Sequence, residues 1–437
     1  MKRIIFCLAF ILFFCTRGHS IGIWVDLNIN ITISNLNSVY AVTNSNVWAG
    51  GFLGHVIHTT DEGLTWSEHG ILEFGTMEIY ALSAIDSQTV LVAVHNANPQ
   101  QTYIFKTTNG GQLWFPAFSQ QTGWIDDIKM INATSGFAYG DPVGGRWTLL
   151  RTNNGGTSWD STGMYLPETN GNKGWLNAMT VYYTGFNAPV IWFGTAQGLV
   201  YKSSDGGFTW ASQPIPMNGD VFCLAFSDAN TGFCGSDNAV CGTTNGGANW
   251  NLLSAPGGGQ VNSFIYNSGQ FWYARNMDIF FSTNSGGNFN LQHSTPAGIY
   301  QHMSFVFSAN NNTQSTIGGW AITGKNIISH YKDQNIGIQQ ISSNVPSKFK
   351  LEQNYPNPFN PSTKIRFDIP HISGNQNIVL TIYDITGKEV SRPVNQSLSP
   401  GTYEMQWPEG SGISSGIYFY RLNYSNYSET KKMVMIK

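Results

Sequence analysis

The sequence is poor in charge, and this scarcity excludes several classes of protein. Lys, Arg, Asp and Glu make up 11% of the 437 residues, against about 25% in an average soluble domain. A chain this poor in charge is not a coiled coil, nor a region kept disordered by charge repulsion. The net charge of −3 excludes nucleic-acid binding driven by bulk positive charge. We therefore expect no nucleic-acid partner.

Long apolar runs are also missing. The run at residues 4–15 is too short to span a bilayer comfortably and has the length of a signal-peptide core. Two basic residues precede it, and the small residues Gly18 and Ser20 stand before a plausible cleavage point at Ile21. We predict a signal peptide over residues 1–20 and no membrane span in the mature chain.

Cysteine is scarce, and the predicted signal peptide removes two of the five. The remaining three, Cys223, Cys234 and Cys241, fall on three successive predicted strands. A disulfide between neighbouring strands and buried free thiols both remain open. The sequence has no Cys-x-x-Cys and no nearby His pair, so we expect no metal site. We also expect no cofactor.

Glycine and aromatic residues are abundant instead. There are 48 Gly and 14 Trp, and aromatic residues make up 14% of the chain, a balance that favours an all-β protein with many tight turns. The phrase S/T-x-D/N-x-G-x-x-W recurs six times, with its final aromatic residues 48, 45, 51, 40 and 39 residues apart. Its third and eighth positions are Asp61, Asn109, Asn154, Asp205, Asn245 and Asn284, and Trp66, Trp114, Trp159, Trp210, Trp250 and Phe289.

This phrase has the chemistry of a tight turn. The hydroxyl and the Asp or Asn side chain can bond backbone groups of the same turn, the Gly permits positive φ, and the aromatic residue can pack between sheets. The phrase resembles the Asp-box, or bacterial neuraminidase-type (BNR), repeat. The segment at 137–147 is similar to propellers of the photosystem II stability/assembly factor type. Because Asn replaces Asp in four of the six phrases, we expect a structural role for the boxes rather than a catalytic one.

Periods of about 40–50 residues indicate a propeller or a solenoid. Six boxes predict six blades, and residues 302–331 supply three strands of a seventh without a box. The fourth strand can come from residues 23–28, with Trp24 in the role of the box aromatic. Pairing the two ends in this way removes exposed sheet edges. We therefore predict an all-β, seven-bladed β-propeller over residues 21–335, with four strands in each blade.

The chain changes character after a predicted linker at residues 336–346. Five phrases between residues 355 and 437, from YPNPFNPST to TKKMVMIK, resemble the C-terminal type A sorting domain of the type IX secretion system of Bacteroidetes-type bacteria. Alternating apolar residues predict a small Ig-like β-sandwich over residues 347–437. The resemblance implies that the type IX machinery is a partner and that the protein is extracellular or on the outer cell surface. Whether this domain is cleaved stays open.

Candidate ligand-binding residues lie in the connections opposite the boxes, where propellers usually hold ligands. Aromatic and charged side chains on one rim can bind a sugar or a protein loop, although turn chemistry, a surface Asp–Arg pair and aromatic packing also account for them. The candidates are Trp124, Asp126, Asp141, Arg146, Trp175 and Arg275.

The sequence carries no recognisable catalytic set, so we predict no catalytic residue and leave catalysis open. The predicted propeller has three arginines and lacks the Arg-Ile-Pro phrase of sialidases. We predict a secreted or surface scaffold that binds an unknown protein or glycan. The alternatives are a glycoside hydrolase of the neuraminidase-repeat type, for which Asp126 and Asp141 are the candidate carboxylates, and an assembly factor for an envelope complex.

Overall fold

The computed structural model describes residues 22–436 except 30, 32, 34, 71–73, 76, 218, 268, 283, 307–317, 326, 333–338, 343, 361, 372–376, 397, 408–413 and 426. The predicted signal peptide lies outside the described residues. The chain divides into two compact units, here called the ring unit (Ile23–Lys332) and the tail unit, which includes Asp333–Lys437. Within the described part, no helix has the length and apolar character needed to cross a membrane.

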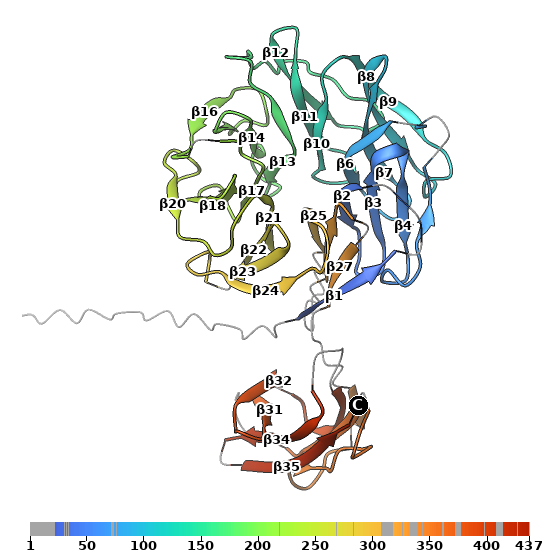
Figure 1. Cartoon of the computed structure of the whole chain (residues 1–437), viewed down its shortest axis with the longest axis vertical. Coiled ribbons are helices and arrows are strands. Elements are labelled where there is room, and N and C mark those ends of the chain that lie inside the picture. Colours follow the sequence, from blue (N-terminus) through green and yellow to red (C-terminus); the bar gives the residue numbers. More distant parts are fainter. Residues whose placement is uncertain are drawn as a thin grey trace, which may run out of the picture. The chain divides into compact units, whose positions relative to one another are not determined.

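The described residues of the ring unit form seven antiparallel sheets, which Figure 1 shows arranged around a common centre. One short 3-10 helix, η1 (Phe52–Gly54), interrupts the first sheet in sequence. The sheets are β2 (Leu36–Ala41), β3 (Val47–Gly51), β4 (Val56–Thr59) and β5 (Ser67–Glu68); β6 (Glu78–Ala84), β7 (Val90–Ala97), β8 (Gln100–Thr107) and β9 (Phe115–Gln121); β10 (Ile125–Met130), β11 (Gly136–Val143) and β12 (Arg146–Thr152); β13 (Gly174–Tyr182), β14 (Val190–Thr195), β15 (Leu199–Ser203) and β16 (Ala211–Pro214); β17 (Cys223–Phe226), β18 (Gly232–Gly235), β19 (Val240–Thr243) and β20 (Asn251–Leu253); β21 (Val261–Asn267), β22 (Gln270–Arg275), β23 (Asp278–Ser282) and β24 (Asn290–Ser294); and β25 (Tyr300–Val306), β26 (Gly318–Thr323), β27 (Ile327–Lys332) and β1 (Ile23–Asn28).

The first strand of each sheet lies innermost (Figure 1) and contacts the first strand of the next sheet. The contacts run from β2 through β6, β10, β13, β17 and β21 to β25, and β25 contacts β2 again. Box aromatics such as Trp66, Trp159 and Phe289 pack between neighbouring sheets. Trp66 of the first box lies edge-on to Trp320 of the last sheet, with ring centroids 6.1 Å apart. Aromatic burial of this kind supplies much of the packing energy between sheets.

The N-terminal strand joins the last sheet, which confirms the predicted pairing of the two ends. β1 pairs antiparallel with β27, with Trp24 opposite Tyr331. The Trp24 side chain is buried against the rings of Trp272, Phe305 and Tyr331. Asp26 of β1 accepts hydrogen bonds from Ser329 at 2.6 Å and from His293 at 2.7 Å. β1 is therefore bound both to its own sheet and to the strand β24 of the preceding one.

The third sheet departs from the predicted four strands, since it has three. After its box, the chain makes only two isolated bridges to β12, at Arg151–Asp160 and Arg146–Pro167. The segment contains Gly163 and Gly171, both with positive φ, and Pro167, which has no N–H for a ladder. A continuous outer strand is not compatible with this composition.

The boxes form hydrogen-bonded turns of the predicted kind. Ser203 donates to Asp205 Oδ1 at 2.8 Å and accepts the N–H of Gly207 at 2.8 Å. Asp205 Oδ1 in turn accepts the N–H of Thr209 at 3.0 Å. Gly207 has φ +96°, which explains why the fifth position of the box is glycine. The hydroxyl-to-Asp/Asn contact recurs at Thr59, Thr107, Thr152, Thr243 and Ser282.

The box hydroxyls are expected to stabilise the ring unit measurably. Ser203→Ala leaves the buried N–H of Gly207 without its acceptor and should lower the free energy of unfolding by about 1–3 kcal/mol. Urea unfolding followed by tryptophan fluorescence measures this loss. The adjacent exposed Ser204 provides the matched control, because Ser204→Ala should change stability by less than about 0.5 kcal/mol. Equal stability of the two variants would contradict a structural role for the box.

The three cysteines of the ring unit are free and buried. Cys234 and Cys241 are direct cross-strand partners on β18 and β19. Cys223 donates its S–H to the Val261 carbonyl of the next sheet at 3.2 Å. The sequence left open a disulfide between neighbouring strands or buried free thiols, and the structure contains buried free thiols.

The tail unit forms two four-stranded sheets around one apolar core. Residues 339–342, which the sequence assigns to the linker, form the strand β28 and pair with β33. The core draws residues from both sheets, including Phe367, Trp407 and Tyr420. The strands are β28 (Gln339–Ser342), β33 (Gly401–Trp407), β30 (Thr363–Ile369) and β29 (Lys350–Leu351), and β32 (Glu389–Gln396), β31 (Ile378–Asp384), β34 (Gly416–Tyr424) and β35 (Tyr427–Met435).

Candidate functional site

Four of the six sequence candidates come together on the face of the ring unit opposite the boxes. Each box follows the third strand of its sheet, so the starts of the inner strands and the ends of the second strands meet at the other face. There, the ends of β6, β7, β10, β11 and β13 bring together a group of residues that we call the rim cluster. It consists of Glu78, Tyr80, His95, Trp124, Asp126, Tyr139, Asp141, Gly174 and Trp175.

Trp124 is the half-exposed aromatic surface of the rim cluster. Its indole stacks on the His95 ring at 4.4 Å and lies 4.5 Å from the Tyr80 ring. Thr102 gives its single hydroxyl proton to the Gly123 carbonyl, so its contact with His95 makes His95 Nδ1 the donor. Burial lowers the pKa of His95, although the charges of Glu78 and Asp141 act against this shift. The neutral ring is therefore fixed beneath Trp124.

Asp141 is held at the edge of the cluster by backbone contacts. Its N–H donates to the Trp124 carbonyl at 3.0 Å, and its Oδ1 accepts the N–H of Gly174 at 2.9 Å. Burial raises the pKa of Asp141 above its usual value, while the Gly174 N–H and the charges of Lys173 and His95 oppose the rise. The carboxyl is half-buried, so one side of it remains open to a ligand.

Asp126 is the unusual member of the rim cluster. The residue is 3% exposed, and its Oδ2 has no hydrogen-bond partner among the described residues. A Cβ built on Gly174 would lie 2.0 Å from this oxygen, so the carboxyl packs directly against the glycine. Burial, together with the charges of Asp141 and Asp127, raises the pKa of Asp126 well above its usual value. A buried carboxyl without partners costs about 1–3 kcal/mol or more.

The neighbouring Asp127 shows what a structural carboxyl in this position looks like. It accepts the N–H of Ile128 at 2.8 Å and the N–H of Met179 in the next sheet at 3.2 Å. Lys129 lies 3.2 Å from its Oδ2. Asp127 is therefore fully used in joining β10 to β13. Asp127 thus has a structural role, whereas Asp126 Oδ2 has no hydrogen-bond partner among the described residues.

Trp175 forms the other aromatic side of the cluster. Its carbonyl accepts the Tyr139 hydroxyl at 2.5 Å, and its ring lies edge-on to Phe222, with centroids 4.8 Å apart. Burial raises the pKa of the Tyr139 hydroxyl well above its usual value, so it remains a proton donor at neutral pH. Tyr139 thus fixes the chain at Trp175 and leaves the half-exposed indole at the surface.

The remaining two candidates lie outside the cluster. Arg275 is buried and donates to the carbonyls of Ala255, Pro256 and Gly259, which gives it a loop-bracing role. Arg146 is exposed at the start of β12, and no ion pair joins it to Asp141 in the described part of the chain.

Sequence reasoning missed Glu78, Tyr80, His95, Tyr139 and Gly174. Alignment of the repeats could have identified Tyr80, because Tyr80 and Asp126 occupy equivalent places at the starts of β6 and β10. Tyr80 donates its hydroxyl to Glu78, which adds a third carboxyl to the cluster.

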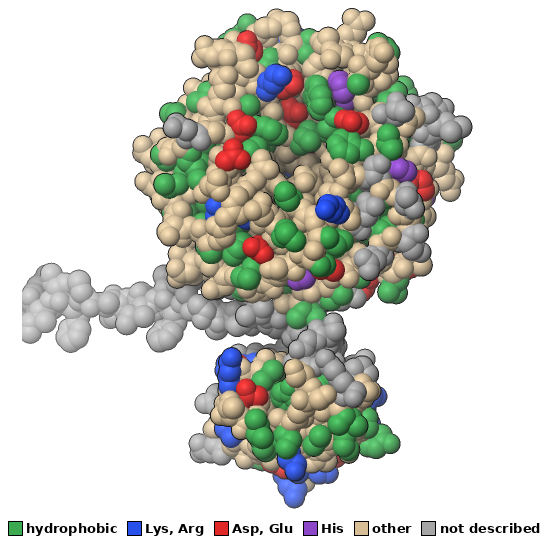
Figure 2. Space-filling view, in the orientation of Figure 1, with side chains coloured by type: hydrophobic (Ala, Val, Ile, Leu, Met, Phe, Trp, Pro, Cys, Tyr) green, Lys and Arg blue, Asp and Glu red, His purple; other side chains and the backbone are tan. Residues whose placement is uncertain are grey.

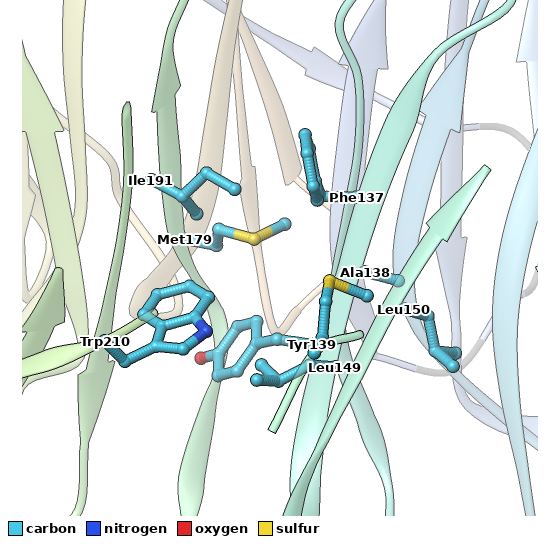
Figure 3. Close-up of a pocket in the computed structure, with 9 residues that line it drawn as sticks. Phe137, Ala138, Tyr139, Leu149, Leu150, Met179, Ile191 and Trp210 are labelled. Atoms are coloured by element: carbon cyan, nitrogen blue, oxygen red, sulfur yellow. The ribbon is translucent and has the colours of Figure 1, made fainter. Parts of the chain in front are cut away.

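The apolar cavity drawn in Figure 3 is not a second ligand site. It measures about 10 Å³ and lies between β11, β12 and β13, where Leu149, Met179 and Trp210 point toward one another. This volume suits a single water at most, and the lining is apolar, so the cavity is a packing gap between sheets. Among the described residues, no group of His, Cys, Asp or Glu side chains is arranged to hold a metal ion.

Charge differs between the two units. Residues 22–335 carry 9 Lys and Arg against 18 Asp and Glu, a balance of −9, whereas residues 346–437 carry 10 against 7, a balance of +3. Figure 2 shows acidic side chains across the viewed face of the ring unit and basic ones around the tail unit. The rim cluster therefore lies in an acidic unit, which attracts cationic groups rather than anionic ones.

Comparisons with known proteins agree with this division. Residues 353–437 match the family model of the secretion system C-terminal sorting domain, which indicates type IX secretion to the cell exterior or surface. A search of curated proteins found no match.

Several solved propeller structures resemble the ring unit in fold. YCF48 bound to D1 peptide is 15% identical, with 71% of this chain and 96% of that one covered and a TM-score of 0.54. YCF48 from Cyanidioschyzon merolae is 14% identical, with 72% and 100% covered and a TM-score of 0.53. An ancestral GH74 enzyme is 14% identical, with 95% and 63% covered and a TM-score of 0.51. At these identities the likeness supports a β-propeller fold and nothing further.

Proposed function

We propose that the protein is an exported scaffold whose seven-bladed propeller binds a protein or a glycan at the rim cluster. In this proposal the six Asp-box turns are structural, residues 21–335 form the propeller, and an Ig-like sandwich at residues 347–437 engages the type IX machinery. The closed series of contacts between inner strands supports seven blades. The matched sorting domain supports delivery to the cell surface or beyond.

The observation that carries the binding proposal is the unpartnered carboxyl of Asp126 beside half-exposed aromatic rings. A site of this kind combines flat surfaces for stacking with polar groups that a ligand can satisfy. Trp124 and Trp175 supply the rings, and Asp141 supplies an open acceptor. Among the described residues, the buried side-chain oxygens without a partner are those of Asn44, Gln213, Gln270 and Asp126, and Asp126 is the carboxyl among them. A carboxyl is the costliest of these groups to leave unsatisfied.

A glycoside hydrolase is the second candidate, and one observation favours it. Asp126 and Asp141 both touch Gly174, and burial raises the pKa of both. A glycosidase needs two such carboxyls flanking the scissile bond, one neutral as the acid and one ionised. Asp126 would be the acid and Asp141 the base or nucleophile. The fold likeness to an ancestral GH74 enzyme is compatible with this alternative.

The assembly-factor alternative rests on a protein ligand. One YCF48 structure is described as bound to D1 peptide, so a propeller of similar fold holds a peptide. The same rim would then recognise a segment of an envelope protein. A partner that copurifies with the full chain would favour this reading.

The test is a glycan array and a polysaccharide-hydrolysis screen with the mature chain. Binding should fall at least ten-fold in Trp124→Ala, because stacking surface is lost while the fold is kept. The control is Phe186→Ala in the β13–β14 connection on the box face, where the side chain is 94% exposed. Released sugar that disappears in both Asp126→Asn and Asp141→Asn would make the protein a hydrolase instead. Ligand binding that is unchanged in Trp124→Ala would contradict the proposed site.

A further inference from the structure

Five of the seven inner strands of the ring unit share an irregularity that places one residue out of register. The pairing with the second strand shifts between Leu36 and Ser38, between Ile79 and Ala81, between Ile125 and Asp127, between Val261 and Ser263, and between Tyr300 and His302. A shift of this type inserts an unpaired residue and re-aims its side chain. The residues so placed are Asn37, Tyr80, Asp126, Asn262 and Gln301.

In two sheets this residue has a clear structural role. Asn37 donates its amide to the Ile79 carbonyl at 3.0 Å, and Asn262 donates to the Tyr300 carbonyl at 2.8 Å. Each acceptor is the residue directly before the shift in the next sheet. The amide donor thus joins adjacent sheets at the entry of their inner strands.

Asp126 occupies the same position without making such a bond. Tyr80 and Gln301 do not make it either, since they donate locally, to Glu78 and to the Ile299 carbonyl respectively. The residue directly before the shift in the next sheet is Gly174, and Asp126 Oδ2 lies against it. A carboxylate has no N–H to donate to a carbonyl. When it is ionised, Asp126 therefore places an acceptor where Asn37 and Asn262 place a donor, and its Oδ2 is buried without a partner among the described residues. A buried polar group that is left unsatisfied is a candidate functional group.

We propose that Asp126, with Asp141 and the Trp124 ring, seats the cationic nitrogen of a lysine or arginine side chain from a polypeptide partner. This inference rests on the proposed binding function and names the class of ligand. The carboxyl groups of Asp126 and Asp141 both lie against Gly174, and a cation neutralises them where a neutral sugar hydroxyl does not.

The cluster also fits the rest of such a side chain. Arg and Lys carry apolar stems that pack along aromatic surfaces, and Trp faces attract cations. The nearby basic residues do not neutralise Asp126. Lys129 is paired with Asp127, and the charge of the exposed Lys173 acts on Asp141 rather than on Asp126. Trp124 and Trp175 provide half-exposed aromatic surface beside the carboxyl groups.

Binding of a cation is expected to release a proton, because it favours the ionised form of Asp126. Affinity should then rise with pH until the pH exceeds the raised pKa of Asp126 in the free protein. Several titratable and charged groups face Asp126 or its carboxyl neighbours and share in this equilibrium. They are Glu78, Tyr80, His95, Asp127, Lys129, Tyr139, Asp141 and Lys173.

The test compares the synthetic peptide Gly-Gly-Arg-Gly-Gly with its citrulline counterpart and with the neutral glycan cellohexaose. Titration calorimetry on the full mature chain, in two buffers of different ionisation enthalpy, measures affinity and proton release. The arginine peptide should bind at least ten-fold more tightly than the citrulline peptide, with proton release and with weaker binding at high salt.

Two variants separate the site from the fold. Asp126→Asn should abolish the preference for arginine and raise the Tm by about 2–4 °C, since it replaces a buried carboxyl by the neutral amide that Asn37 and Asn262 carry at this position. The gain in Tm should be larger at pH 8 than at pH 4. The wild-type protein loses stability as the pH rises above about 3.9, the pKa of an aspartate in the unfolded chain, because burial in the folded protein then opposes ionisation of Asp126. Asp86→Asn, in an exposed turn on the box face, is the matched control and should change neither property.

The outcomes distinguish this inference from the proposed function. Equal binding of the arginine and citrulline peptides, or binding of cellohexaose alone that depends on Trp124, overturns the cationic ligand and leaves the scaffold in place. No binding of any probe, together with an unaffected Trp124→Ala variant in the glycan screen, overturns both. A lower Tm for Asp126→Asn contradicts the equivalence with Asn37 and Asn262 on which the inference stands.

Discussion

Replacing Trp24 by alanine is expected to lower the free energy of unfolding of the ring unit by about 3–5 kcal/mol. The side chain is 7% exposed and contacts Trp272, Phe305 and Tyr331. It also anchors the strand that joins the two ends of the ring unit. Its removal therefore leaves a cavity and weakens the pairing of β1 with β27. Without β1, the edge of β27 would be exposed.

Tryptophan fluorescence during urea unfolding measures this effect, because every Trp except Trp407 lies within the ring unit. The signal thus separates the ring unit from the tail unit in a chain that is not expected to unfold in one step. Phe186→Ala, which removes an exposed ring, should leave the transition unchanged. A Trp24→Ala variant within about 0.5 kcal/mol of the wild type would show that β1 is dispensable to the fold.

The strand that Trp24 anchors was predictable, and the reason is physical. The six boxes account for six sheets, and the strands at residues 302–331 form a seventh that lacks its outer strand. Residues 23–28 are the alternating apolar segment available to supply this strand. The structure pairs these residues, Ile23–Asn28, with β27. The missing strand of the third sheet was harder to foresee. Its trace in the sequence is the longest spacing of box aromatics, the 51 residues from Trp159 to Trp210.

The candidate site was predictable only in part. Trp124, Asp126, Asp141 and Trp175 follow from the rule that ligands bind opposite the boxes, and the structure brings them together. Tyr80 was missed because a shift of one residue in the inner strand β6 reverses the face to which its side chain points. No local sequence pattern announces such a shift. His95 lies on the second strand β7 and joins the cluster through its stacking on Trp124. The contacts of Arg275 with the carbonyls of Ala255, Pro256 and Gly259 could not be foreseen either, since charge alone does not distinguish a loop brace from a ligand contact.

One glycine supports both the fold and the site, and its replacement has the second large expected effect. A Cβ on Gly140 would lie 1.8 Å from the Trp124 carbonyl oxygen and 2.9 Å from the Ile125 Cα. Both are backbone atoms that cannot turn aside. Gly140→Ala should therefore destabilise the ring unit by about 3 kcal/mol, at the upper end of the usual cost of overpacking. Thermal unfolding followed by tryptophan fluorescence measures the loss.

The same substitution should also remove ligand binding, because it moves the backbone that carries the site. The Trp124 carbonyl accepts the N–H of Asp141, so displacement of Trp124 disturbs the aromatic surface and the open carboxyl together. Gly258→Ala is the matched control, since the position is exposed and a Cβ there meets nothing within 4 Å. Gly51 faces the Asn35 carbonyl at 2.1 Å in the first sheet, and Gly51→Ala should destabilise the ring unit equally without touching the rim cluster. If Gly51→Ala abolished binding as fully as Gly140→Ala, the loss would reflect the fold alone, and the rim cluster would no longer be needed to explain it.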